Sequence, residues 1–229
     1  MADRDAFHQR PFSLPPGATE VILVRHGASE AAIEGVRFPV VDGRADPALS
    51  EEGVEQAQSV AERLAAEGAD GLYVSTLRRT LQTARPLAAA TGLEPTVLAD
   101  LTEVYLGIFD AGEYRVRVGR NDPIIQRVFA EQRWDAIPEA ESLESLGSRV
   151  RAAVERIVAE TGPDATAVAV AHGAVIGELC RQATESRPFA FVHADNGSVS
   201  RLVVHADGRW LLRSFNDISH LTVTTGPAG

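Results

Sequence analysis

Side chains that can bind anions or transfer protons stand directly after the short apolar runs of this sequence. Arginine binds phosphate oxygens through paired hydrogen bonds. A neutral histidine nitrogen can attack a phosphorus atom, and a glutamate can protonate the oxygen that leaves. The combination indicates chemistry on a small phosphorylated molecule. The residues concerned are Arg25, His26, Ser75, Arg78, Arg79, Glu103 and His172.

The composition limits which catalytic chemistry is available. The sequence has no lysine, so all 22 basic residues are arginines. A Schiff-base lysine, a pyridoxal-phosphate anchor and a Gly-Lys phosphate loop are therefore excluded. Transfer of a phosphoryl group needs positive charge on its equatorial oxygens, and in this chain guanidinium groups must supply it.

Charge and apolar content exclude several classes of protein. The chain has 229 residues, of which 45% are hydrophobic and 24% charged, as in ordinary globular proteins. The net charge of -10 disfavours nucleic acid and anionic membranes as partners. No apolar run is long enough to span a membrane, and the first twenty residues lack the apolar segment of a secretory signal. We therefore expect a cytoplasmic protein.

Short apolar strands alternate with amphipathic helices along the chain, which predicts a layered α/β fold with a mostly parallel sheet. Strands are predicted at 21–24, 72–75, 94–98 and 166–171, and a closing hairpin at 198–205 and 210–215 around Asp207-Gly208. Helices are predicted from Ser50 to Gly68, over 78–91, 123–132 and 141–161, and through Cys180. Within the second helix, Pro86 should cause a kink or a split.

Parallel sheets bind ligands beyond the carboxyl ends of their strands. The arginines, histidines and glutamate that follow the predicted strands should therefore gather at one edge. We expect one domain over 21–221, preceded by an extended or disordered arm at 1–20 and followed by a tail at 222–229. The single cysteine, Cys180, excludes an intramolecular disulfide and, in a monomer, a cysteine-based zinc site. Its apolar neighbours predict a buried thiol.

Five ordered segments, each at a strand end or helix start, carry a resemblance to a known family. They are Val21-Ile-Leu-Val-Arg-His-Gly-Ala-Ser29, Asp46-Pro-Ala-Leu-Ser-Glu-Glu-Gly53 with Gln56-Ala57, Ser75-Thr-Leu-Arg-Arg-Thr-Leu-Gln-Thr-Ala84, Leu101-Thr-Glu103 with Gly107, and Val168-Ala-Val-Ala-His-Gly173. Together they resemble the histidine phosphatase superfamily, also called the phosphoglycerate mutase-like family. Asn196-Gly-Ser-Val199 and Asn216-Asp-Ile-Ser-His-Leu221 resemble its closing segments. The resemblance implies a three-layer α/β/α fold.

The resemblance also implies a role for each matched residue. His26 would become the phosphohistidine, Arg25 and Arg79 would bind phosphate oxygens, and His172 would hydrogen-bond the phosphoryl group. Glu103 would protonate the leaving alkoxide and then activate water. Ser29 and Gly173 would add contacts to the substrate. No metal or organic cofactor is implied, and the partner is a small phosphorylated substrate.

Two departures from the family pattern favour hydrolysis over phosphate mutation. Ala28 and Ala32 replace polar residues that the family usually has after Arg-His-Gly, and no lysine follows Glu103. A mutase must hold a doubly phosphorylated intermediate, which takes extra cations. We therefore expect a metal-independent phosphomonoesterase. A cofactor-dependent phosphoglycerate mutase and a non-catalytic phospho-ligand binding module are the alternatives.

Several assignments stay open at the level of sequence. The irregular segment 105–140 is expected to cap the site and set specificity. Trp134 and Phe109 fit the core and an apolar substrate wall equally well, and His193 is a candidate for the edge of the site. Glu141 and Ser142 match a segment that borders the site in relatives. A missing cation could come from Arg37, Arg44, Arg115, Arg117 or Arg120. A homodimer is one option for the assembly.

Overall fold

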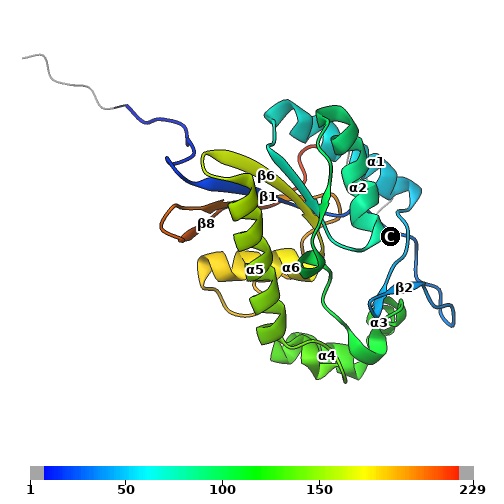
Figure 1. Ribbon diagram of the computed structural model, residues 1–229. Coiled ribbons are helices and arrows are strands. Elements are labelled where there is room, and N and C mark those ends of the chain that lie inside the picture. Colours follow the sequence, from blue (N-terminus) through cyan, green and yellow to red (C-terminus); the bar gives the residue numbers. More distant parts are fainter. Residues whose placement is uncertain (1–7, 222–229) are drawn as a thin grey trace, which may run out of the picture.

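The computed structural model describes residues 8–221 and is built around one mixed β-sheet (Figure 1). In this part of the chain six strands pair in the order β5-β4-β6-β1-β7-β8. The first four are parallel to one another, whereas β7 pairs antiparallel with both β1 and β8. The strands are β1 (Thr19–Arg25), β4 (Gly71–Val74), β5 (Thr96–Val97), β6 (Ala165–Ala171), β7 (Val199–Val204) and β8 (Trp210–Asp217), and the short pair β2 (Val40–Val41) and β3 (Arg44–Ala45) lies apart from the sheet.

Helices cover both faces of this sheet. In β1, Ile22 and Val24 belong to the core shared with α1 and α2, whereas Val21 and Leu23 belong to the core shared with α5 and α6. This alternation follows from the two-residue period of a strand. The predicted three-layer α/β/α fold is therefore confirmed. The helices are α1 (Glu51–Glu67), α2 (Arg78–Thr91), α3 (Glu113–Gly119), α4 (Pro123–Glu131), α5 (Leu143–Thr161) and α6 (Gly173–Thr184), with 3-10 turns η1 (Ala99–Leu101), η2 (Gly107–Phe109) and η3 (Trp134–Ala136).

Capping residues set the helix boundaries. The side chain of Ser50 accepts a hydrogen bond from the Gly53 N–H at the start of α1, as predicted. The predicted helix at 141–161 begins two residues later because Ser142 is its cap and accepts from Ser145 N–H. The predicted helix at 123–132 ends one residue earlier because Gln132 has a φ of 55°, in the left-handed region.

Helix α2 contradicts one expectation drawn from sequence. It runs from Arg78 to Thr91 as one element with Pro86 inside it, so the predicted split is wrong. The neighbours Thr83, Ala84 and Leu87 are buried on the face of α2 that meets the protein interior. Only the split is excluded by this continuity, and the alternative expectation of a kink stays a prediction.

The domain limits also differ slightly from the prediction. Strand β1 begins at Thr19 and pairs with β6 from that residue, so the last two residues of the predicted arm at 1–20 belong to the sheet. The predicted strand at 94–98 is reduced to two residues, and the hairpin is present as β7 and β8. Residues 1–7 of the arm and the tail at 222–229 lie outside the described residues. None of the helices described is long and apolar enough to cross a membrane.

A close contact between two backbone segments fixes the loop that follows β1. A Cβ atom on Gly53 would lie 1.9 Å from the Ala28 carbonyl oxygen, and one on Gly27 would lie 2.3 Å from the Gly53 oxygen. The Ala28 N–H donates to Gln56 at 2.8 Å, and the Gly27 N–H donates to Thr83 at 3.0 Å. The Arg-His-Gly segment is thus held between the first turn of α1 and the side of α2.

We expect Gly53→Ala to destabilise the protein because its new methyl group cannot fit beside the Ala28 carbonyl. Overpacking of this kind costs about 1–3 kcal/mol in the free energy of unfolding. Urea denaturation would measure it. Gly119→Ala in α3 is the matched control, because nothing lies within 4 Å of its added Cβ. An equal change in both variants would contradict the contact.

Candidate active site

A cavity of about 370 Å³ lies where the carboxyl ends of the parallel strands meet the segment 105–140. Arg25 and His26 reach it from the end of β1, and Arg79 from the first turn of α2. Glu103 reaches it from the loop after η1, and Gly173 from the start of α6. The structure therefore brings these residues, predicted from sequence, to one edge of the sheet.

His26 is buried and its two ring nitrogens have different partners. Nδ1 lies 2.7 Å from the Gly27 carbonyl oxygen, which can only accept a hydrogen bond. Nε2 accepts a hydrogen bond from Arg79 Nε at 3.2 Å. These contacts place the proton on Nδ1 and the lone pair on Nε2. Burial, with the positive charges of Arg79 and Arg25, lowers the pKa of His26 well below its usual value. The imidazole is therefore neutral at neutral pH.

Arg25 and Arg79 are cations held mainly by backbone carbonyls. A terminal nitrogen of Arg25 donates to the Ala194 carbonyl, and Arg79 donates to the Ala45 carbonyl at 2.8 Å. Burial lowers the pKa of Arg79 to about 10 and also lowers that of Arg25, in part offset by the negative charge of Glu103. Both stay charged at neutral pH. Arg25 Nε is buried and has no hydrogen-bond partner among the described residues, which suits it to an anion.

His172 stands beside His26, with ring centroids 5.1 Å apart. Its Nε2 lies 2.8 Å from the hydroxyl of Ser75, whereas its Nδ1 is buried with no partner in residues 8–221. The Ser75 hydroxyl is itself fixed, since it accepts from the Leu77 N–H and lies 3.0 Å from the Thr80 hydroxyl. Burial, with the charge of Arg79, lowers the pKa of His172 well below its usual value. His172 is therefore a second neutral imidazole, fully buried behind His26 and not itself among the residues that line the cavity.

Glu103 places a carboxylate close to this end of the cavity. Its Oε1 accepts from the Val104 N–H at 2.9 Å, and its Oε2 lies 3.5 Å from the N–H of Ala174 in the first turn of α6. The backbone carbonyl of Glu103 accepts hydrogen bonds from Arg44 at 2.7 Å and from Arg149 at 3.3 Å. Hydrogen bonds to the side chain of Glu103 and to its backbone carbonyl thus fix the position of the carboxylate.

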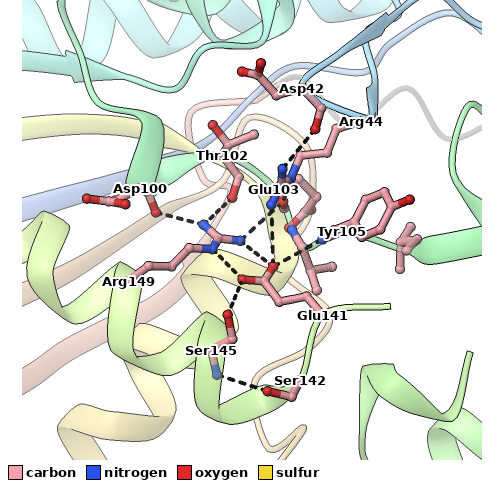
Figure 2. Close-up of polar contacts among 12 residues, drawn as sticks. Asp42, Arg44, Asp100, Thr102, Glu103, Tyr105, Glu141, Ser142, Ser145 and Arg149 are labelled. Carbon is pink, nitrogen blue, oxygen red and sulfur yellow. Dashed lines mark hydrogen bonds and ion pairs between the residues drawn. The ribbon is translucent and has the colours of Figure 1, made fainter. Parts of the chain in front are cut away.

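A network centred on Arg149 of α5 holds the chain around Glu103 (Figure 2). Arg149 forms two hydrogen bonds with Glu141, at 2.7 and 2.9 Å, and donates to the carbonyls of Asp100 and Thr102. Burial opposes ionisation of Glu141, but its hydrogen bonds with Arg149 and the charge of Arg149 hold its pKa below the usual value. Sequence reasoning selected Glu141 but missed Arg149. The only available signal was that Arg149 precedes Val150, and Val150 lies on the buried face of a predicted helix.

The remaining candidates are divided between the cavity and the surface. Ser29 is not among the lining residues, and its hydroxyl accepts a hydrogen bond from Arg115 at 2.7 Å, so its contact with a substrate stays a prediction. Arg44 and Arg115 line the cavity. Arg117 pairs with Glu113 and Asp122, Arg120 pairs with Glu34, and Arg37 is exposed. Arg78 pairs with Asp46.

The segment 105–140 supplies much of the other wall of the cavity. Trp134 and Phe109 are both buried, and both also line the cavity. Each therefore belongs to the core and to the wall of the cavity, the two alternatives that the sequence left open. His193 also lines it and stacks on Phe129 at 5.9 Å between ring centroids. Cys180 is buried in the core, as predicted, and burial raises the pKa of its thiol to about 12. Across residues 8–221, no group of three or more histidine, cysteine, aspartate or glutamate residues could hold a metal ion.

Comparison with known proteins assigns the family. Residues 21–218 match the family described as the histidine phosphatase superfamily, branch 1. The chain belongs to this superfamily. Among its relatives, it is 34% identical over 211 residues to phosphoglycerate mutase-like protein 4 of Arabidopsis thaliana, covering 90% of this chain and 88% of that protein. It is 30% identical over 209 residues to a probable phosphoglycerate mutase of Yersinia enterocolitica, covering 88% and 94%.

The similarity extends to solved structures. This histidine phosphatase superfamily member matches a mycobacterial glucosyl-3-phosphoglycerate phosphatase with a TM-score of 0.72 and 27% identity, over 87% of this chain and 99% of the other. The resemblance drawn from the five sequence segments is confirmed. The relatives include proteins named as mutases and as phosphatases, so family membership by itself leaves the reaction of this chain open.

The tautomer of His26 can be measured directly. We expect the Nδ1–H form, because the Gly27 carbonyl can only accept. The ring should stay neutral at about pH 6.5, where an ordinary histidine is half protonated, because its lowered pKa moves protonation to lower pH. NMR of labelled imidazole nitrogens would show this, with the signal assigned by its loss in His26→Asn. A positively charged His26 ring at that pH would refute the assignment.

Removing Arg149 should leave Glu141, a half-buried carboxylate, without its paired hydrogen bonds and with only the longer contact to Arg44. We expect Arg149→Leu to lower the free energy of unfolding by roughly 3–5 kcal/mol. Arg149→Leu with Glu141→Leu should be more stable than Arg149→Leu alone, because no unpaired charge is left. Arg156→Leu on the same helix breaks an exposed pair with Glu160 and should change little. Urea denaturation of the three variants and the wild type tests the network, which fails if the double variant is the least stable.

Proposed function

We propose that this protein is a metal-independent phosphomonoester hydrolase that acts through a phosphohistidine at His26. The observation that carries the proposal is the neutral imidazole of His26, whose Nε2 lone pair faces Arg79 in a cavity also lined by Arg25 and Glu103. A bound phosphoryl group can take the Arg79 N–H that Nε2 accepts here. The lone pair would then be free to attack.

In the first step Nε2 of His26 attacks phosphorus, and the bond from phosphorus to the ester oxygen breaks. Arg25 and Arg79 donate hydrogen bonds to the equatorial oxygens, where charge is concentrated. The carboxyl group of Glu103 gives its proton to the leaving alkoxide. This step releases an alcohol and leaves a phosphoryl group on His26.

In the second step the Glu103 carboxylate takes a proton from water, and the resulting nucleophile attacks phosphorus. The phosphorus–nitrogen bond breaks, and its electron pair returns to Nε2. Glu103 ends protonated and His26 neutral, so both groups are ready for another turnover. Inorganic phosphate is the second product.

Ser75 would set the tautomer of His172 in this mechanism. If the Ser75 hydroxyl donates to Nε2, the ring keeps its proton on Nδ1, the nitrogen without a partner. Nδ1–H can then donate to a phosphoryl oxygen. Ser75 acts as a positioning residue, since it touches His172 and not the substrate.

The hydrogen bonds that Arg44 and Arg115 make to the protein favour hydrolysis over the mutase alternative. Arg44 donates to the carbonyls of Asp42 and Glu103 and lies 3.7 Å from Glu141. Arg115 donates to Ser29 and to the Glu30 carbonyl. A mutase must hold a second phosphate next to the first. Among the described residues, Arg25 has a buried nitrogen without a partner, whereas neither Arg44 nor Arg115 has one. Water is therefore the expected acceptor of the phosphoryl group.

Turnover of p-nitrophenyl phosphate in the presence of chelator is the first test of this function. We expect His26→Ala to lower kcat by more than about 1,000-fold, because the nucleophile is lost. His205→Ala, beyond the end of β7, should keep full activity. Acid-quenched wild type should retain labelled phosphate, and His26→Ala should not. Activity in His26→Ala close to that of wild type would overturn the nucleophile assignment.

Two substrates test the acid role of Glu103. An alkyl phosphate needs protonation of its leaving oxygen far more than p-nitrophenyl phosphate does. Glu103→Gln should therefore lower kcat by about 100-fold or more on the alkyl ester and by less on the aryl ester. Equal losses would argue against this role. If a primer of bisphosphoglycerate supports phosphoglycerate isomerisation faster than hydrolysis, the mutase alternative holds instead.

A further inference from the structure

The cavity has two ends of different chemistry. At one end, Arg25, His26 and Arg79 line the cavity, and Arg25 Nε is a buried polar atom without a partner in the described part of the chain. The rest of the cavity extends toward the segment 105–140, which contributes aromatic and aliphatic side chains. The apolar wall consists of Phe38, Leu106, Phe109, Tyr114, Phe129, Trp134 and Val192.

Contacts among the aromatic rings give the apolar wall a fixed shape. Trp134 lies 6.2 Å from Tyr114 and 4.7 Å from Phe189, measured between ring centroids. Phe129 lies 6.0 Å from Phe189 and stacks on His193 with 15° between their planes. Offset and edge-to-face pairs of this kind hold each other in place. The wall is therefore formed before any substrate arrives.

Polar groups next to the apolar wall are already satisfied by the protein. Asp110 accepts three backbone N–H groups, from Ala45 at 2.6 Å, Ala111 at 2.8 Å and Leu106 at 3.1 Å. Arg44 and Arg115 bind protein acceptors, as described above. A second anionic group on a substrate would meet the carboxylates of Asp110 and Asp195 without a free guanidinium to pair with it.

We propose that the preferred substrates are phosphomonoesters of an apolar, ring-bearing alcohol that carries no second anionic group. The inference rests on the proposed hydrolase function and names its leaving group. The phosphate binds between Arg25, Arg79 and His172, and the ring of the alcohol packs against the apolar wall. Burial of apolar surface favours such a substrate by about 25 cal/mol for each Å² removed from water. The reaction consumes water and releases the alcohol and inorganic phosphate.

The test uses alcohols with the same leaving ability but different bodies. Benzyl phosphate and ethyl phosphate leave as alcohols of similar acidity, so a difference between them reports contact with the protein. We expect kcat/KM for benzyl phosphate to exceed that for ethyl phosphate by about 10–100-fold. Phosphoglycerate, with its carboxylate, should be hydrolysed more slowly than benzyl phosphate. Equal values for benzyl and ethyl phosphate, or a preference for phosphoglycerate, would overturn the inference and leave the hydrolase standing.

Phe129→Ala locates the effect on the apolar wall. Phe129 is 36% exposed, so its truncation should leave the fold intact. The variant should lower the ratio of kcat/KM for benzyl phosphate to that for ethyl phosphate by about 5–10-fold, chiefly through KM. Phe12→Ala is the matched control, because Phe12 is 44% exposed and stacks on Arg213, far along the chain from the cavity residues. An unchanged ratio in Phe129→Ala would overturn the role of the wall.

A binding measurement separates this inference from the proposed function. Benzylphosphonate and ethylphosphonate cannot be hydrolysed, so calorimetry with both reports recognition without turnover. Tighter binding of benzylphosphonate, lost in Phe129→Ala, supports the apolar wall even if no ester is hydrolysed, in which case only the hydrolase function fails. Equal binding of the two phosphonates would overturn the inference whatever the turnover assays show.

Discussion

The burial of two guanidinium groups at the carboxyl edge of the sheet is the constraint on which the candidate site depends. Arg25 and Arg79 donate to backbone carbonyls, and in both cases burial is the largest cause of a lowered pKa. Their charge is also part of why His26 and His172 are neutral. A chain with a net charge of -10 can thus present a local cationic pocket. Such a pocket is incomplete until an anion supplies the missing acceptor, which is the physical basis for expecting a phosphate there.

The backbone around the nucleophile candidate is fixed by contacts that also explain the sequence motifs. Gly27 and Gly53 approach so closely that neither tolerates a side chain, and Gln56 and Thr83 each accept one N–H of the loop after His26. The Asn196 side chain donates to the His26 carbonyl. Glycine, glutamine and threonine in those motifs therefore serve the geometry of the loop. Accurate positioning of reacting groups is a major source of catalytic rate.

The Arg149 network and the segment 105–140 form the rest of the candidate site. The Arg149 network binds Glu141 and the backbone from Asp100 to Glu103, and so fixes the carboxylate proposed as acid and base. The segment 105–140 covers the cavity with aromatic rings and supplies Arg115 to its rim. Relatives named as mutases and as phosphatases share the fold, so the reaction and the leaving group are decided by these local features. The hydrogen bonds of Arg44 and Arg115 to the protein support the proposal of hydrolysis.

The sequence by itself determined the layered fold and the gathering of Arg25, His26, Arg79, Glu103 and His172, because strand periodicity and parallel order place strand ends at one edge. Only the tertiary structure decided the rest. Pro86 lies inside a continuous helix, and Ser29 binds Arg115, 86 residues away, instead of lining the cavity. Arg149 reaches Thr102 across 47 residues, and the tautomer of His26 depends on its bond to Gly27 and on Arg79. Contacts between residues so far apart leave no periodic signal in the sequence, so they appear only once the chain is folded.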